Sequence, residues 1–236
     1  MIAVIQAGGR GTRLRPYTLA LPKPLMPVGD LPIIEVLLKW LRRWGVRDAW
    51  ITLGHLGGLI RTICGDGVQW DMKIGYSQEP EPLGTIGPLR LIRDHLKETV
   101  LTVNGDVISD VDLRAFIKFH QDHKGLVTVA VSEKNMKVDL GVFETENGRM
   151  TGFREKPAMK FIVSMGIYCM EPEILYLIPG NVPFGFDDLM HEMLDRKMPV
   201  YLYRHNGLWL DIGREEDFRQ AQEFFQKDYK TLILGC

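Results

Sequence analysis

The most constraining feature of this 236-residue chain is an alternation of two patterns between residue 1 and about residue 131. Short apolar runs that are typical of buried strands, such as IAVIQ (2–6) and TVLTVN (99–104), come between stretches with apolar residues at helical spacing, such as 34–41. A repeated strand–helix–strand order predicts a mainly parallel sheet with helices on both faces. We therefore expect an α/β chain with a Rossmann-like three-layer α/β/α arrangement.

The pattern changes beyond residue 132. Three strand-like segments follow one another with short connections, and two helices are expected only later, near 188–196 and 215–225. We expect this half to extend the same sheet and to add a small antiparallel lid. The prediction is a single domain, 1–236, with halves 1–131 and 132–236.

Composition narrows the class of protein. The formal net charge of −1 gives no basic excess that would favour nucleic acid as a partner. No apolar run reaches the roughly 18–20 residues of a membrane span, and arginines and glycines directly after MIAVIQA argue against a secretory leader. We expect a cytoplasmic protein whose three widely spaced cysteines, Cys64, Cys169 and Cys236, stay reduced.

The histidines and nucleophiles do not indicate a known catalytic centre. None of the six histidines has a metal-ligand spacing such as H-E-x-x-H. His120 and His123 share one predicted helix, where packing or surface roles are expected. No Ser-His-Asp arrangement can be argued from the order of residues.

The first predicted strand leads into AGGRGTRLRP (7–16), a loop suited to phosphate. A P-loop would need a Gly-Lys pair, and the chain contains none. A dinucleotide-binding loop would need a third glycine where Leu14 stands. The remaining interpretations are a looser loop over which Arg13 and Lys23 reach a triphosphate, or a plain turn with surface arginines.

Two aspartates follow predicted strands that lie far apart in the sequence. Asp106 comes directly after TVLTVN and Gly105, and Asp211 follows the apolar run 208–210. Two carboxylates at two strand ends could hold one hard divalent cation, although each could instead cap a turn or a helix.

Seven segments together resemble one family. AGGRGTRLRP, PKPLMPVGDLPII, QEPEPLGTIG, VNGDV, DLGVF, FREKP and GLWLDIGREEDFRQA occur in order over about 210 residues. They are similar to motifs of the sugar nucleotidyltransferases, also called nucleoside-diphosphate-sugar pyrophosphorylases. The resemblance implies an Mg²⁺-dependent enzyme that joins a nucleoside triphosphate to a sugar 1-phosphate and releases pyrophosphate.

The resemblance also assigns site residues. It implies catalytic roles for Arg13, Lys23 and Asp106, and metal ligation by Asp106 and Asp211. The implied nucleotide-binding residues are Ala7, Gly8, Gly9, Gly11, Thr12, Arg13, Gln78, Pro82, Gly84 and Thr85. The implied sugar-phosphate-binding residues, in the part that includes the lid, are Asn104, Gly141, Glu155, Lys156, Ser164 and Asp188, although Asp188 could equally cap a helix.

The substrates stay open at this point. Ser164 and Met165 stand where many members have Asn-Ala, which puts the identity of the sugar in doubt. The short build resembles guanylyltransferases acting on mannose or heptose 1-phosphate, and implies a compact enzyme that can form a homodimer. The alternatives are a UTP-, CTP- or dTTP-dependent transferase acting on glucose 1-phosphate or a non-sugar phosphate, a catalytically silent regulatory subunit, and a dinucleotide-dependent oxidoreductase.

Overall fold

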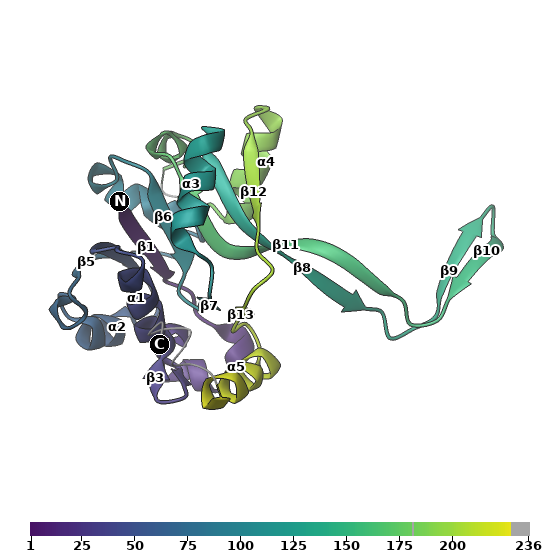
Figure 1. Cartoon of the computed structure of the whole chain (residues 1–236), viewed down its shortest axis with the longest axis horizontal. Coiled ribbons are helices and arrows are strands. Elements are labelled where there is room, and N and C mark those ends of the chain that lie inside the picture. Colours follow the sequence, from purple (N-terminus) through teal and green to yellow (C-terminus); the bar gives the residue numbers. More distant parts are fainter. Residues whose placement is uncertain (181, 228–236) are drawn as a thin grey trace.

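A seven-stranded sheet forms the centre of the protein in the computed structural model, which describes residues 1–180 and 182–227 (Figure 1). Only β11 (Ala158–Met170) runs antiparallel to its neighbours in this sheet, which is therefore mainly parallel, as predicted. The strands lie in the order β12 (Val200–Arg204), β8 (Val127–Lys137), β11 (Ala158–Met170), β6 (Val100–Asn104), β1 (Ile2–Ala7), β4 (Asp48–Leu53) and β5 (Lys73–Gln78).

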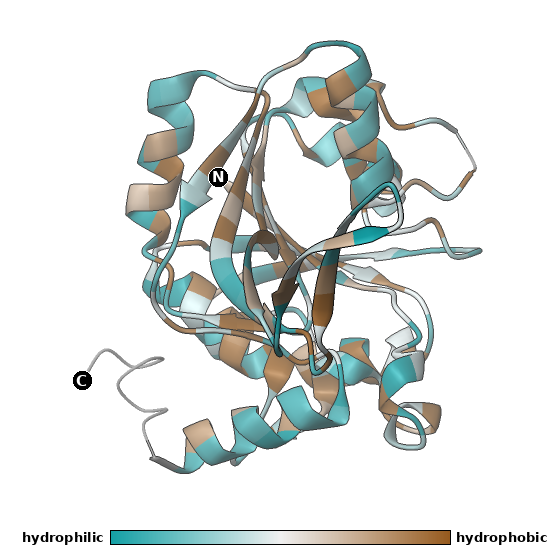
Figure 2. Ribbon diagram, turned by 90° about the vertical axis from the view of Figure 1, so that its right-hand side faces the viewer, coloured by the Kyte–Doolittle hydropathy of each residue, from teal (hydrophilic) through white to brown (hydrophobic). Residues whose placement is uncertain are grey.

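Each face of the sheet is covered by its own apolar core. In β1, Ala3, Ile5 and Ala7 belong to one core and Val4 belongs to the other, because successive side chains of a strand point to opposite faces. The first core includes α1 (Ile33–Arg43), α2 (Gly57–Cys64) and α3 (Leu113–His123); the second includes the 3₁₀ segments η5 (Gly87–His95) and η6 (Pro172–Tyr176) and helix α4 (Phe186–Asp195). Apolar and polar residues alternate along these flanking helices (Figure 2). The predicted three layers are confirmed.

One predicted helix has a different form. The sequence of 85–97, TIGPLRLIRDHLK, predicts a helix with Pro88 in its first turn, and the structure has a 3₁₀ helix that begins at Gly87. Pro88 has no N–H to donate, and the amides of Ile86 and Gly87 both donate to the carbonyl of Phe184, at 3.0 and 2.9 Å. The start of the segment is therefore fixed by a distant chain segment.

The C-terminal helix α5 (Glu215–Lys227) fastens the loops that follow the opening motif. The Gly29 amide donates to Gln222 Oε1 at 3.0 Å, and Gln222 Nε2 donates to the Pro27 carbonyl at 2.6 Å. The remaining short elements are η1 (Thr12–Leu14), η2 (Tyr17–Leu19), η3 (Lys23–Leu25), β2 (Pro27–Val28), β3 (Leu31–Pro32), η4 (Val68–Trp70), β7 (Val107–Ser109) and β13 (Trp209–Asp211). Helix α5 therefore holds the segment that follows the opening loop in place.

The antiparallel element is present, but it does not cover the body. Beyond Ser132 and Val163, β8 and β11 leave the sheet as a two-stranded ribbon, which continues into β9 (Val142–Glu146) and β10 (Arg149–Arg154). We call residues 132–163 the arm. The arm projects away from the rest of the molecule (Figure 1). The predicted lid is therefore an extended arm in this structure.

Cysteines and histidines have structural surroundings. Cys64 and Cys169 are buried free thiols, and burial raises the pKa of Cys64 to about 12; Cys236 lies outside the described residues. His120 is buried and contacts Thr128 Oγ1 at 2.8 Å and Glu171 Oε1 at 2.9 Å.

Within residues 1–180 and 182–227, no helix has the length and apolar character needed to cross a membrane.

The close approach of two loops gives a first test of this packing. A Cβ on Gly54 would lie 2.3 Å from the carbonyl oxygen of Gly8, whereas a Cβ on Gly58 would meet nothing within 4 Å. We expect Gly54→Ala to lower the free energy of unfolding by about 1–3 kcal/mol through overpacking. Gly58→Ala, in α2, should be neutral or stabilising by up to about 1 kcal/mol. Denaturant titration of both variants checks this, and equal stabilities would contradict it.

Candidate active site

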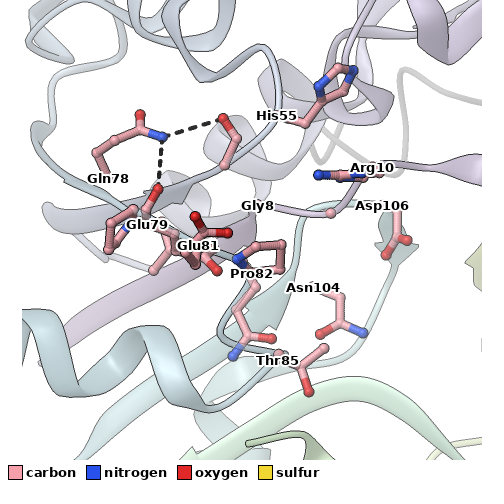
Figure 3. Close-up of a pocket in the computed structure, with 16 residues that line it drawn as sticks. Gly8, Arg10, His55, Gln78, Glu79, Glu81, Pro82, Thr85, Asn104 and Asp106 are labelled. Carbon is pink, nitrogen blue, oxygen red and sulfur yellow. Dashed lines mark hydrogen bonds between the residues drawn. The ribbon is translucent and has the colours of Figure 1, made fainter. Parts of the chain in front are cut away.

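Two adjoining cavities open where four parallel strands, β1, β4, β5 and β6, end. This edge is where open α/β sheets place ligand sites. The larger cavity has a volume of about 540 Å³ and the smaller about 240 Å³, and Asp106 lines both. The larger is lined by Gln6, Gly8, Gly9, Arg10, Thr52, Gly54, His55, Gln78, Glu79, Pro80, Glu81, Pro82, Gly84, Thr85, Asn104 and Asp106 (Figure 3).

A row of unpartnered polar groups crosses the floor of the larger cavity. Gln6 is in register with Thr52 on one side and with Asn104 on the other. Both polar atoms of the Gln6 amide, Thr52 Oγ1 and Asn104 Oδ1 are buried and have no hydrogen-bond partner among the described residues. Because a buried polar group without a partner costs about 1–3 kcal/mol, these groups point to a polar ligand.

The opening loop forms the wall of the smaller cavity. Gly11 adopts a positive φ of 59°, its carbonyl accepts a hydrogen bond from the Thr18 hydroxyl at 2.8 Å, and Leu14 is buried. Two cations, Arg13 and Lys23, lie at this cavity. Its lining consists of Gln6, Ala7, Gly9, Gly11, Thr12, Arg13, Lys23, Pro24, Gly105 and Asp106. The loop thus presents glycine backbone and positive charge together, which suits phosphate.

Lys23 and Asp106 meet between the two cavities. Lys23 is only 8% exposed, and its ammonium contacts Asp106 Oδ2 as an ion pair. The other oxygen, Asp106 Oδ1, is buried without a partner among the described residues. Gly105 permits this placement, since a Cβ there would lie 2.8 Å from the Gln6 carbonyl oxygen.

Asp211 lies beside Asp106, as the resemblance implies. Strand β13 pairs with β7, and the Ile212 amide donates to the Asp106 carbonyl at 3.1 Å. Burial and then the charge of Asp106 raise the pKa of the Asp211 carboxyl, with Lys23 acting in the opposite direction. Two neighbouring carboxylates with an unpartnered oxygen fit one Mg²⁺, which uses few protein carboxylates and completes its shell with water and phosphate. No cluster of three or more His, Cys, Asp or Glu residues that could hold a metal ion occurs in the described ranges.

The opposite end of the larger cavity is formed by the segment after β5. Gln78 Nε2 donates to the carbonyls of Gly54 and Glu79, at 3.3 and 3.4 Å (Figure 3). Glu79 Oε2 accepts a hydrogen bond from the Leu83 amide at 2.9 Å, and burial raises the pKa of Glu79. Gly84 has a φ of 79° and packs against the Phe184 carbonyl. This end is therefore built from a closely packed turn that offers amide and carboxylate groups.

Three of the predicted sugar-phosphate residues belong to the body of the protein rather than to the arm. Asn104 lines the larger cavity, and a Cβ on Gly166 would lie 2.7 Å from Asn104 Nδ2. Ser164 Oγ accepts from the Gly166 amide and donates to the Tyr168 hydroxyl, both at 3.3 Å. Asp188 accepts from the Gly185 amide at 2.7 Å, so its carboxylate caps α4.

The other three, Gly141, Glu155 and Lys156, belong to the arm. They lie in its turns and connections between β8, β9, β10 and β11, and none of them lines either cavity of the described chain. The structure thus gathers all ten predicted nucleotide-binding residues at the strand edge but separates them from half of the predicted sugar-phosphate set.

Several cavity residues were not predicted from the sequence. Gln6 and Thr52 are polar side chains at the ends of apolar strands, and that position was a usable signal because it matches Asn104 in the parallel register. Arg10, Gly54, His55, Glu79, Pro80 and Glu81 were also missed; of these, Glu79, Pro80 and Glu81 lie within the motif that suggested Gln78 and Pro82.

Comparison with known proteins decides the family. A model of the nucleotidyl transferase family matches residues 2–228. This chain belongs to the nucleotidyl transferase family. Among curated relatives, it is 32% identical to a UTP–glucose-1-phosphate uridylyltransferase of Synechocystis over 94% of the chain, and 34% identical to a mannose-1-phosphate guanylyltransferase catalytic subunit beta of Danio rerio over 92%. The chain spans about 62% of the length of these two relatives.

Solved structures share the fold. A putative glucose-1-phosphate thymidylyltransferase from Bacillus anthracis, in complex with sucrose, superposes with a TM-score of 0.78 at 23% identity, covering 97% of this chain and 96% of that one. HddC from Yersinia pseudotuberculosis gives 0.76 at 24% identity, covering 95% and 99%. The family assignment makes a dinucleotide-dependent oxidoreductase untenable.

The two neighbouring carboxylates give a stability test. Asp211 has a raised pKa, so its ionised form costs folding free energy at neutral pH, and the cost vanishes below the ordinary pKa of 3.8 where both states are protonated. We expect Asp211→Asn, in metal-free buffer at pH 7, to raise Tm by about 2–4 °C. The gain should disappear near pH 3.5. Thermal unfolding at both pH values measures it, and a variant less stable than the parent at pH 7 would contradict it.

Proposed function

We propose that this chain transfers a nucleotidyl group from a nucleoside triphosphate to a sugar 1-phosphate and releases pyrophosphate, with GTP and a mannose- or heptose-type 1-phosphate as substrates. The observation that carries the proposal is the Lys23–Asp106 ion pair between a glycine-rich basic cavity and a larger cavity with an unsatisfied polar floor. Cations and backbone amides on one side, and polar groups on the other, suit a triphosphate and the nucleoside that it carries.

The reaction needs positioning and charge compensation more than covalent chemistry. A phosphate oxygen of the sugar phosphate attacks the α-phosphorus, a new P–O bond forms, and the bond to the β-phosphate oxygen breaks so that pyrophosphate carries away the electron pair. Arg13 presents a planar fork of donors to the leaving phosphates, and Lys23 supplies a mobile charge that holds both phosphates in line. No covalent nucleophile is required.

Asp106 and Asp211 would hold the metal. The unpartnered Asp106 Oδ1 and the burial of Asp211 support that assignment. A Mg²⁺ ion held there would neutralise negative charge on the phosphates. Lys23 and a metal ion would share Asp106. The role of Asp106 is then to keep the Lys23 ammonium next to the metal site.

Glu79 supports guanine as the base. Its Oε2 is held by the Leu83 amide, and its Oε1 lies beside Gly8 in the wall of the larger cavity. A carboxylate accepts hydrogen bonds only, and guanine presents adjacent N1–H and N2–H₂ donors, whereas uracil presents a single N–H between two carbonyls. The guanylyltransferase relative is consistent with this interpretation, and the uridylyltransferase relative keeps UTP as the alternative.

Two other roles stay as alternatives: a transferase using glucose 1-phosphate or a non-sugar phosphate, and a silent regulatory subunit. Arg13, Lys23, Asp106, Lys156 and Asp211 are all present, which speaks against the silent subunit. The free thiols of Cys64 and Cys169 are in keeping with the cytoplasmic location that we propose.

A substrate panel tests the proposed reaction. The protein is incubated with Mg²⁺, each of the four common nucleoside triphosphates and a set of sugar 1-phosphates, and pyrophosphate release is followed. We expect the fastest release with GTP and mannose or heptose 1-phosphate, and no release without a divalent cation. If no pair of nucleoside triphosphate and sugar 1-phosphate gives pyrophosphate release, the proposed activity is refuted and the silent regulatory subunit is favoured.

Lys23 provides the sharpest single change in the site. We expect Lys23→Ala to reduce turnover about 100-fold or more, because the charge that aligns the phosphates is lost, while the protein stays folded. Lys39→Ala is the matched control, since Lys39 is a partly exposed residue of α1 that forms an ion pair with Glu35 on the same helix. Steady-state kinetics and circular dichroism are the measurements, and unchanged turnover would remove Lys23 from the site.

Base choice can be tested at Glu79. Glu79→Gln keeps the size of the side chain but replaces one acceptor oxygen by a donor. We expect the preference for GTP over UTP, measured as the ratio of kcat/KM values, to fall about 10-fold or more. Glu81→Gln, a change of the same kind in the same wall, should alter this ratio less. If both variants keep the parent ratio, another group reads the base.

A further inference from the structure

The arm exposes an unusual amount of apolar surface. Of 19 large apolar side chains that are exposed among the described residues, eight lie in the arm. Together they leave on the order of 800 Å² of apolar side chain in water, distributed along the arm. The eight residues are Met136, Leu140, Phe143, Met150, Phe153, Met159, Phe161 and Ile162.

These side chains gather on shared faces of the ribbon. Met136 is directly opposite Met159 in the β8–β11 pairing, and Phe143 is opposite Phe153 in the β9–β10 pairing, with ring centroids 4.9 Å apart. Opposed residues of antiparallel strands point to the same face. The two phenylalanines are 61% and 50% exposed, and their rings form an apolar pair in the β9–β10 hairpin at the far end of the arm. We call this exposed pair the apolar tip.

The direction of the arm is set by the sheet itself. Pairing between β8 and β11 runs from Val131 and Ser164 in the sheet to Lys137 and Ala158 in the arm without a register shift. At its base, Lys134 lies over the Trp209 ring at 4.4 Å. The ribbon therefore leaves the body as a continuation of two central strands, and it carries Glu155 and Lys156 away from the cavities of its own chain (Figure 1).

We propose that the arm docks on a second copy of this chain, and that each arm supplies Glu155 and Lys156 to the cavity of the other copy. This rests on the proposed function, which needs cationic and polar groups for the sugar phosphate beside Asp106. The two cavities obtain no lining residue from the arm of their own chain. A partner's arm would complete them.

The chemistry of the arm favours a copy of itself as partner. It carries six basic and five acidic side chains, so two arms related by a two-fold axis can pair opposite charges. The exposed apolar area matches the roughly 800 Å² per partner of a stable interface. The body also offers Tyr17 and Leu19, 53% and 61% exposed, in the loop beside the smaller cavity, where an apolar tip can dock.

Sedimentation tests the interface without any substrate. We expect the parent protein to be a dimer at micromolar concentration and Phe143→Asp/Phe153→Asp to be a monomer. The matched control, Tyr176→Asp/Leu194→Asp, changes two apolar residues that are 88% and 70% exposed outside the arm, and should stay dimeric. If circular dichroism shows that the phenylalanine variant is unfolded, a second arm variant, Met136→Lys/Met159→Lys, takes its place. A monomeric parent, or arm variants that stay dimeric, would overturn the proposal.

Complementation tests whether the site is shared. Lys23→Ala and Lys156→Ala are each expected to be inactive, and an equimolar, re-equilibrated mixture should recover about a quarter of the parent turnover. The reason is that half of the dimers are mixed, and one site in each mixed dimer has both lysines intact. No recovery by the mixture, or full activity of Lys156→Ala alone, would show that the arm does not act on the partner's site. A parent protein inactive with every substrate pair would refute the proposed function instead, and sedimentation would still decide the interface.

Discussion

The site depends on one constraint, which is that parallel strands deliver their last side chains to a single sheet edge. Gln6, Thr52 and Asn104 are brought side by side by the pairing of three strands, with their polar atoms withdrawn from water. An edge that served only to hold the fold would have apolar residues or paired polar groups in these positions. Desolvation of these polar atoms is unfavourable, but the two apolar cores stabilise the fold enough to tolerate it. The cores fix the register of the strands, and the register fixes the positions of the three side chains.

Lys23 offsets electrostatic repulsion between two carboxylates at this edge. Asp106 lies next to Asp211, and two ionised carboxylates in a half-buried position repel one another. Lys23 occupies one oxygen of Asp106 and leaves the other without a partner among the described residues, so the site retains an uncompensated acceptor. Asp106 Oδ1 can therefore bind a cation or accept a hydrogen bond, and the neighbouring glycine loop suits anions. This combination supports the phosphate substrates and the accompanying cation that we propose.

Much of this arrangement could be predicted from the sequence, because its determinants are local. Apolar periodicity located the central strands and most helices, and a strand end followed by Gly105 and Asp106 indicated a carboxylate at the cavity edge. The resemblance added the pairing of Asp106 with Asp211, which no local pattern could supply across 105 positions. Gln6 and Thr52 escaped notice, since their importance appears only when strands are aligned side by side. The 3₁₀ form of 87–95 also depends on a distant carbonyl, that of Phe184.

The course of the arm could not be predicted because nothing local fixes it. Alternating residues in 132–163 specify two-stranded pairing, but the direction of the ribbon follows from β8 and β11 being central strands of the sheet. Strand pairing that extends beyond a core gains hydrogen bonds and little burial, so such a ribbon stays apolar only where another surface covers it. The apolar tip and the distance of Lys156 from its own cavities therefore have one physical explanation. Both follow if the surface that covers the arm is also the site that the arm completes.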